Sequence, residues 1–275
     1  VVGTVALVTT VIGAVHTIHS DPFSISLLLP IGLLLVAYLL FGWFGAVIDE
    51  SMAGKYNEQV DRSFRIGMLW FIFSEVMFFA AFFGALFYIR VFVVDWLDGG
   101  GNNFMTHQLL WPGFEGVWPL LTNPDSAAVP GPRQSMGPAG LPAINTAILL
   151  LSSVTITIAH HGLRQNHRKP LIIWLAITVM LGATFLVLQV EEYIHANREL
   201  GLTFDSGIYG STFFILTGFH GMHVTIGTTM LLVMLVRAIK GHFTSDNHFA
   251  FEAVAWYWHF VDVVWLGLFI FVYWL

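Results

Sequence analysis

A single acidic residue, Glu75, lies inside a long apolar stretch that runs from Arg65 to Tyr88. At about 1.5 Å per residue, Glu75 is about 15 Å along a helix starting at Arg65, and a bilayer's hydrocarbon core is about 30 Å thick. The carboxyl is therefore expected near the bilayer midplane. An ionised carboxylate there costs about 3 kcal/mol, so apolar surroundings favour the neutral acid. Two roles are open: a structural hydrogen bond between helices, or the handling of protons.

Two further apolar stretches carry histidines. His220 and His223 share one helical face, and His259 and Asp262 repeat that spacing nearer the C-terminus. Helical rise gives Glu75, His220 and His259 similar depths, so these five residues predict a buried polar cluster. A metal site is disfavoured, because open metal sites need three or more protein ligands and no HExxH, EF-hand or cysteine motif is present. Hydrogen bonds between helices are the expected role, since lipid offers polar groups no partner.

The composition indicates what kind of element holds these residues. Of the 275 residues, 56% are hydrophobic and 10% charged, whereas soluble domains carry about 25% charged residues. With a mean hydropathy of +0.75, this predicts an all-α, polytopic membrane protein. No cysteine is present, which excludes disulfides, thiolate metal sites and thiol catalysis. The sequence starts at Val1, inside an apolar segment, so residues before it are expected to be missing.

Seven apolar segments are separated by polar or Gly- and Pro-rich breaks. They span residues 1–18, 24–48, 65–95, 141–162, 169–195, 207–239 and 248–275. Lysine and arginine concentrate on the cytoplasmic side of short connections. The second, fourth and sixth connections hold eight of the eleven basic residues, and the opposite side holds Arg90, Arg133 and Arg198. This predicts a cytoplasmic N-terminus and an external C-terminus.

The connections divide the chain unevenly. The first two spans, joined by a short turn at His19 to Pro22, form a hairpin of residues 1–48, and a polar cytoplasmic linker of residues 49–64 follows. Five spans then form a bundle over residues 65–275. Within it, the Gly- and Pro-rich segment 94–140 is expected to cap the outer face, because loops of such length tend to be functional or to cover partners.

Histidines gather at the cytoplasmic end of the fourth span. His160, His161 and His167 stand beside Arg164 and Arg168. Histidine exchanges protons near neutral pH, so this rim could collect protons, or it could hold anionic headgroups. A plain solvated basic loop is an equally good interpretation.

The outer end of the fifth span is acidic. It contains Glu191, Glu192 and His195. These residues are expected to lie at the membrane interface, with Tyr193 as an aromatic anchor.

Aromatic and charged residues also stand near the cytoplasmic ends of spans two, three and six. They are Trp43, Glu50, Tyr56, Arg65, Arg237 and His242. Side chains of these types at this depth commonly hold phospholipid headgroups. Snorkelling explains each residue singly, and only their convergence between the two-helix and five-helix units would indicate a specific lipid.

Motifs of other functional classes are lacking. No phosphate-binding loop, nucleophile elbow, Ser/His/Asp order or nucleic-acid-binding stripe occurs in the sequence. Neither a free-standing catalyst nor nucleic-acid binding is therefore expected.

Five sequence runs resemble a known family. They are SEVMFF (74–79), AHHGL (159–163), QVEEY (189–193), GSTFFILTGFHGMHV (210–224) and HFAFEAVAWYWHFVDVVW (248–265). Together they resemble subunit III of cytochrome c oxidase, in order from about Trp43 to Trp274.

The resemblance implies seven helices, two and five, splayed into a V, with bound phospholipids in the cleft and direct docking on catalytic subunit I. It implies no haem or copper in this chain, since these cofactors belong to partner subunits. Subunit II, small accessory subunits and cytochrome c, as electron donor to the complex, are further implied partners. The implied role is a non-redox accessory subunit in aerobic respiration that stabilises subunit I and supports proton uptake.

Individual positions carry the same implication. Glu75 matches the family's intramembrane glutamate, and Tyr56 or Asn57 stands where a lipid-binding histidine is common. The matching lipid-contacting positions are Trp43, Glu50 and Arg237. The segment 94–140 is longer than in the mitochondrial form and indicates a bacterial protein, placed in the inner (plasma) membrane with a periplasmic C-terminus. The first span resembles the family only in placement.

Three alternatives stay open. Subunit III of a quinol oxidase typically has five spans, so the first hairpin argues against it. An autonomous proton pathway built on Glu75, His220 and His259 would conduct in liposomes as the isolated protein. A membrane metalloenzyme would retain stoichiometric metal after purification. Neither of these last two explains the long, ordered motif match.

Overall fold

The protein is all-helical over the residues that its computed structural model describes, 1–19 and 27–275. Seven helices in these ranges are long and apolar enough to cross a membrane. The prediction of an all-α protein with seven spans is therefore confirmed. The expected turn at His19 to Pro22 lies outside the described residues from position 20 onward.

The spans are formed by the following elements. They are α1 (Val2–His19), α2 (Leu28–Met52), α3 (Glu58–Tyr88), α6 (Leu141–Arg164), α7 (Arg168–Arg198), α8 (Ile208–Lys240) and α9 (Phe249–Leu268). A π-helical segment, η2 (Phe269–Trp274), prolongs α9. Another, η1 (Ile89–Val93), joins α3 to α4 (Val94–Leu97), so that residues 58–97 form one 40-residue helix.

Between α2 and α3 only residues 53–57 lie outside helices, whereas the sequence indicated a linker of residues 49–64. The start of α3 explains the difference. Asn57 Oδ1 accepts the Val60 N–H at 2.9 Å, and Glu58 and Asp61 occupy the first turn. A side-chain cap and acidic residues near the positive end of the helix dipole stabilise a polar helix start.

The chain divides into two compact units, Val1–Phe64 and Arg65–Leu275. In the first unit, α1 and α2 pack at glycines. A Cβ at Gly13 would lie 2.3 Å from the Leu29 nitrogen, and a Cβ at Gly32 would lie 2.4 Å from Thr10 Oγ1. Small residues let two helix backbones approach closely in a membrane. The expected V-shaped arrangement of the two units stays a prediction.

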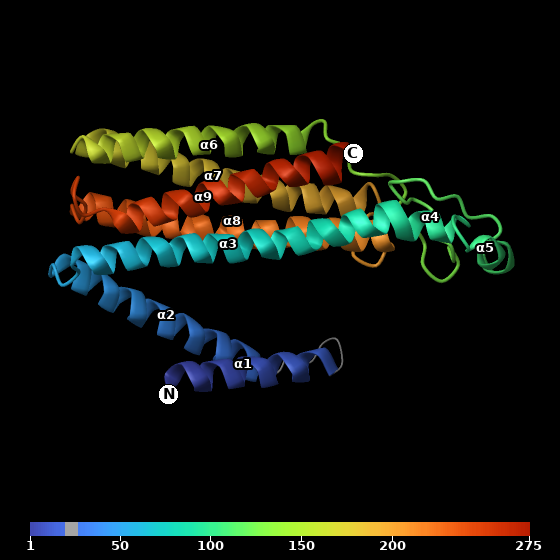
Figure 1. Ribbon diagram of the computed structural model, residues 1–275, viewed down its shortest axis with the longest axis horizontal. Helices are drawn as coiled ribbons and strands as arrows, with labels where there is room; N and C mark the ends of the chain where they lie inside the picture. Colours follow the sequence, from blue (N-terminus) through green and yellow to red (C-terminus); the bar gives the residue numbers. More distant parts are fainter. Residues whose placement is uncertain (20–26) are drawn as a thin grey trace. The chain divides into compact units, whose positions relative to one another are not determined.

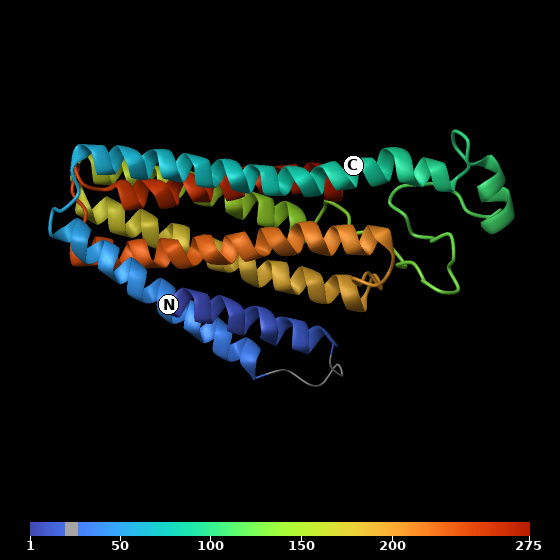
Figure 2. The ribbon, with the colours of Figure 1, turned by 60° about the horizontal axis from the view of Figure 1, so that its bottom comes forward.

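The second unit has a close-packed core of α6, α7, α8 and α9, which run side by side (Figures 1 and 2). Trp258 stands at its centre with no exposed surface. A Cβ at Gly182 or Gly227 would approach its ring to 2.8 or 2.9 Å. The Trp258 indole N–H donates to Ser152 Oγ at 2.9 Å. These glycines therefore admit a large buried indole whose polar atom is satisfied.

The helix α3 lies along this core but contacts it through large aromatic side chains. Phe78 packs edge-on against Phe219 of α8, with ring centroids 5.1 Å apart. Phe79 approaches Phe260 of α9, with centroids 6.1 Å apart. Helix α3 therefore packs on the core through aromatic rings, whereas the core helices approach one another closely at glycines.

The segment 94–140 contains α4 and a second short helix, α5 (Phe104–Leu110). Its later part is tied to the α7–α8 connection. The Arg133 N–H donates to the Leu200 carbonyl at 2.8 Å, and Asn123 Nδ2 donates to the Ser206 carbonyl at 3.2 Å. Both figures place α4 and α5 beyond the ends of α6 to α9. We call this the α5 end of the bundle, and the opposite end, with residues 165–167 and 241–248, the turn end.

Candidate functional site

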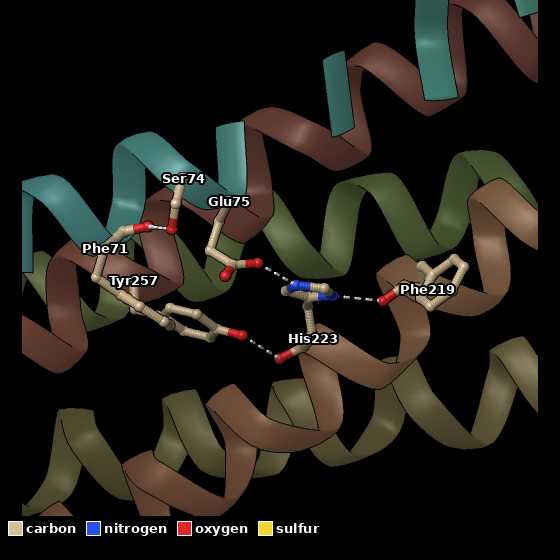
Figure 3. A network of polar contacts seen from close by, with 6 residues as sticks. All are labelled: Phe71, Ser74, Glu75, Phe219, His223 and Tyr257. Carbon is tan, nitrogen blue, oxygen red and sulfur yellow. Dashed lines mark hydrogen bonds and ion pairs between the residues drawn. The ribbon is translucent and has the colours of Figure 1, made fainter. Parts of the chain in front are cut away.

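The most distinctive polar contact of the five-helix unit joins α3 to α8. Glu75 Oε2 lies 2.8 Å from His223 Nε2 (Figure 3). Helical spacing places Phe78 and Phe79 on the face of α3 that carries Glu75. Their rings lie 5.8 and 5.0 Å from the His223 ring. The same face thus supplies both the acid and the apolar wall around the imidazole.

The hydrogen bonds of His223 fix where one of its protons sits. Its Nδ1 lies 2.6 Å from the Phe219 carbonyl oxygen, which can only accept, so Nδ1 carries a hydrogen. At Nε2 two arrangements remain: a neutral Glu75 acid donates to Nε2, or a protonated Nε2 donates to a Glu75 carboxylate. In both, one proton lies between the two residues and the pair is neutral overall. An ionised Glu75 facing a bare Nε2 lone pair would be repelled.

The pair is enclosed unequally. The His223 side chain is 6% exposed and the Glu75 side chain 22% exposed. The Tyr257 ring stacks near His223, and its hydroxyl donates weakly to the His223 carbonyl at 3.4 Å (Figure 3). The imidazole is therefore held within this chain, while part of the Glu75 side chain remains open to its surroundings.

His220, one turn earlier on α8, has a different environment. It is fully buried, and its Nε2–H donates to the Val261 carbonyl of α9 at 3.1 Å. The Trp265 ring lies 5.0 Å away. Its Nδ1 has no hydrogen-bond partner in the described chain. His220 is thus a neutral packing residue with a single tautomer.

His259 and Asp262 meet through a third residue. Ser153 of α6 donates to Asp262 Oδ2 and lies 2.9 Å from His259 Nδ1. Because the Ser153 hydrogen goes to the carboxylate, His259 Nδ1–H donates to the Ser153 oxygen. These hydrogen bonds join α9 to α6, and none of the three residues belongs to α3.

The five intramembrane residues therefore occupy three places: Glu75 with His223, His220 alone, and His259 with Asp262. No hydrogen bond joins these three places within residues 1–19 and 27–275. In the same ranges, no three His, Asp or Glu side chains lie close enough to hold a metal ion.

The three histidines of the expected rim differ in exposure. His160 turns inward, with its ring 5.6 Å from the rings of His248 and Phe251. His161 and His167 are exposed, and His161 Nε2 accepts a hydrogen bond from the Gln165 amide at 2.8 Å. Two exposed imidazoles and one half-buried imidazole thus stand at the turn end.

Three of the six expected lipid-contacting residues belong to the first unit. Trp43 is 62% exposed. The Tyr56 hydroxyl donates to Glu50 at 2.8 Å. Burial, then the hydrogen bond and the charge of Glu50, raise the pKa of Tyr56 above its ordinary value. Tyr56 and Glu50 thus form a local pair that presents one carboxylate.

The other three belong to the second unit. Arg65 forms an ion pair with Glu252 at 2.5 Å, so its charge is compensated within the chain. Arg237 is 6% exposed and lies over the Phe243 ring at 4.6 Å, and no ion pair of Arg237 occurs in the described residues. His242 Nδ1 is buried without a hydrogen-bond partner there. Phospholipid binding by these six residues stays a prediction.

One buried acid was not anticipated. The sequence placed Glu192 at an interfacial edge, but this residue is fully buried, and the Tyr273 hydroxyl donates to it at 2.5 Å. Gln189, which lies beside the carboxyl, is also buried. The sequence did hold a signal for this burial: Gln189 and Glu192 are three residues apart, which puts both side chains on one face of the helix. Glu191 is exposed, as expected.

Comparison with known proteins shows what the whole chain is similar to. The family model for cytochrome c oxidase subunit III matches residues 1–95 and 122–275. Cytochrome c oxidase subunit 3 of Sus scrofa is 43% identical over 253 residues, covering 92% of this chain and 85% of the relative. The protein of that name from Osphranter robustus is 41% identical over 263 residues, covering 95% and 88%. The family match includes the first span, which the sequence motifs did not reach, and omits residues 96–121.

Proposed function

The chain belongs to the cytochrome c oxidase subunit III family, and we propose that it is a non-redox accessory subunit of a bacterial cytochrome c oxidase. Membership makes it an integral membrane subunit of an oxidoreductase complex, with other oxidase subunits as partners, in a family that lacks redox cofactors. The proposal adds direct docking on the catalytic subunit I, next to subunit II and small accessory subunits. Haem and copper reside in those partners, and cytochrome c delivers the electrons.

The Glu75–His223 pair carries the mechanistic part of the proposal. The pair is neutral overall in either arrangement of its proton. Its hydrogen bond joins α3 to α8 without placing a net charge in the membrane. In the proposed arrangement Glu75 is the neutral acid, and its hydrogen bond to His223 fixes the position of α3. The partly exposed carboxyl edge lies on the side from which a partner subunit or a lipid approaches.

Proton uptake is assigned to the turn end rather than to this pair. His161 and His167 are exposed there, and histidine exchanges protons near neutral pH. With His160 they form a rim that, together with bound phospholipids, shapes the proton entrance of subunit I. The turn end would then face the cytoplasm of the bacterium, the N-terminus would be cytoplasmic and the C-terminus periplasmic, in agreement with the distribution of basic residues.

Phospholipid binding forms the third part of the proposal. Arg237 has no acidic partner in the described residues, so an anionic headgroup would supply the missing charge. The remaining residues proposed to contact lipid are Trp43, Glu50, Tyr56, Arg65 and His242. Arg65 contributes mainly packing, because Glu252 already neutralises it.

The first experiment is to purify the complex through a tag on this chain. Haem and copper are quantified, and oxygen consumption is recorded with reduced cytochrome c and with quinol. Haem, copper and cytochrome c activity are the expected result. Activity with quinol alone would indicate a quinol oxidase, and an isolated, metal-free chain that conducts protons in liposomes would overturn the accessory role.

The second experiment tests the role of Glu75. In Glu75→Gln the amide can still donate to His223 Nε2, so the hydrogen bond of the neutral acid is kept. We expect an assembled complex with unchanged proton pumping, whereas His161→Gln with His167→Gln should slow proton uptake. Intact assembly with sharply reduced pumping in Glu75→Gln would show that the carboxyl itself handles protons.

A further inference from the structure

A cluster of exposed apolar side chains covers the short helix α5. Four of its residues are largely exposed: Phe104 by 57%, Met105 by 61%, Leu109 by 75% and Leu110 by 61%. We call these four residues the α5 patch. Exposed apolar side chains are ordinary on helices that face lipid, but in water a cluster of them indicates a contact surface.

The α5 patch is held by defined structure. The preceding helix is continuous over residues 58–97. Its last residue, Leu97, accepts a hydrogen bond from His107 Nδ1 at 3.0 Å, which fixes α5 against the end of α4. The intervening turn uses Gly99 at φ +93°, where a Cβ would also lie 3.3 Å from His107 Cβ. The apolar side chains are thus presented at a fixed place.

Helix length places this patch beyond the bilayer. From Arg65 to Leu97 the chain advances 32 residues. At about 1.5 Å per residue and an average tilt of about 20°, that is about 45 Å along the membrane normal. The hydrocarbon core and one headgroup layer take up only about 36 Å. Figures 1 and 2 likewise show α4 and α5 beyond the ends of α6 to α9.

The segment that carries the patch is acidic between two flanking arginines, Arg90 and Arg133. Residues 91–132 contain four acids and neither lysine nor arginine. The acids are Asp95, Asp98, Glu115 and Asp125, and all four are exposed. Such a surface is repelled by anionic headgroups and attracts basic groups. Position and charge both argue against a membrane surface as the occupant of the patch.

We propose that the α5 patch is the docking surface for another protein whose contact area has an apolar centre ringed by lysine and arginine. An apolar centre with a complementary charged rim is the usual anatomy of a protein interface. The patch lies in residues 96–121, which the subunit III family model does not match. The proposal therefore goes beyond the accessory role in the membrane and does not depend on it.

Photocrosslinking in native membranes tests the proposal. A photoreactive amino acid replaces Met105 in the chain assembled in its complex. The expected product is a single protein, crosslinked through a segment with apolar residues flanked by lysine or arginine, in a yield that falls as salt rises. Crosslinks to lipid, to a second copy of this chain or to no partner would each overturn the proposal.

Matched variants separate docking from general damage. With the probe at Met105, Leu109→Asp should lower the crosslinking yield about tenfold or more, since a central apolar anchor dominates binding. Asn102→Asp adds the same charge at an exposed position in the turn before α5 and should not lower the yield, because an added acid also attracts a basic rim. Both variant chains should be present in the membrane in the same amount as the parent chain. Equal yields in the two variants would contradict the docking role.

Discussion

His220 and His223 are three residues apart on α8, yet they belong to two differently built regions. His220 lies in the close-packed core and donates to one backbone carbonyl, so its proton has a single place. His223 lies at the aromatic contact with α3 and shares a proton with Glu75, so that proton has two places. Three residues rotate a helix face by about 60°. That rotation separates a packing residue from one with acid-base potential.

The two regions should differ most in their tolerance of added volume. Gly227→Val in α8 would drive side-chain atoms into Trp258 and Tyr257, whose rings lie within 3.3 Å of a Cβ at this position. Such overpacking should lower the free energy of unfolding by about 3 kcal/mol. Unfolding of the full chain in mixed detergent micelles measures it.

The matched control is Gly221→Val on the same helix, where nothing lies within 4 Å of the added Cβ. Its effect should stay below about 0.5 kcal/mol. Equal losses at positions 221 and 227 would mean that the core is not packed more tightly than the rest of α8.

The next effect concerns two tyrosine hydroxyls. Tyr273→Phe leaves the fully buried Glu192 without its donor at 2.5 Å, and should lower the free energy of unfolding by about 2 kcal/mol. Tyr257→Phe removes only a weak bond at 3.4 Å at the α3 face, and about 0.5 kcal/mol is expected. Unfolding in mixed detergent micelles again measures both variants. A larger loss of unfolding free energy in Tyr257→Phe than in Tyr273→Phe would contradict the expected difference between the two regions.

A smaller effect is expected where the shared proton lies. His223→Leu removes the partner of Glu75, and the free energy of unfolding should fall by about 1 kcal/mol because the carboxyl keeps some exposure. Glu75→Gln should change it by less than about 0.5 kcal/mol, since the amide can donate to Nε2. Infrared spectra of the two variants and the parent would identify which residue carries the proton.

The smallest effect is expected at the edge of the α3 contact. Arg65→Lys keeps the charge facing Glu252 but loses the planar contact with the Phe249 ring at 5.2 Å. Because this pair is partly exposed, about 0.5 kcal/mol is expected, decreasing at high salt. A salt-independent loss would mean that the ion pair is more deeply buried than its exposure indicates.

Much of the fold could be predicted because a membrane restricts the choices. Apolar segments of suitable length must be helices, and polar breaks must connect them. The ends of the helices were less predictable. The N-terminal turn of α3, for example, is polar and depends on the Asn57 cap. The seven-residue helix α5 was missed because so short a segment shows no periodicity.

For the site residues, the sequence allowed a prediction of depth in the membrane, which stays a prediction, but gave no rotation about the helix axes. Helical rise placed Glu75, His220 and His259 at similar depths, but His259 turns towards Ser153 of α6. Glu191 and Glu192 look alike in sequence, although about 100° of rotation separates an exposed carboxyl from a buried one. The partner of Glu192, Tyr273, is 81 residues away, and nothing local indicates it.

The distance in sequence between Glu75 and His223 affects how the chain is made. The two residues are 148 positions apart. At about 5 to 20 residues per second, the ribosome needs about 7 to 30 s to reach His223 after Glu75. During that interval the imidazole that shares a proton with Glu75 has not yet been made. The polar contact between α3 and α8 therefore forms only after most of the chain has been synthesised, and α8 completes an interface that α3 began.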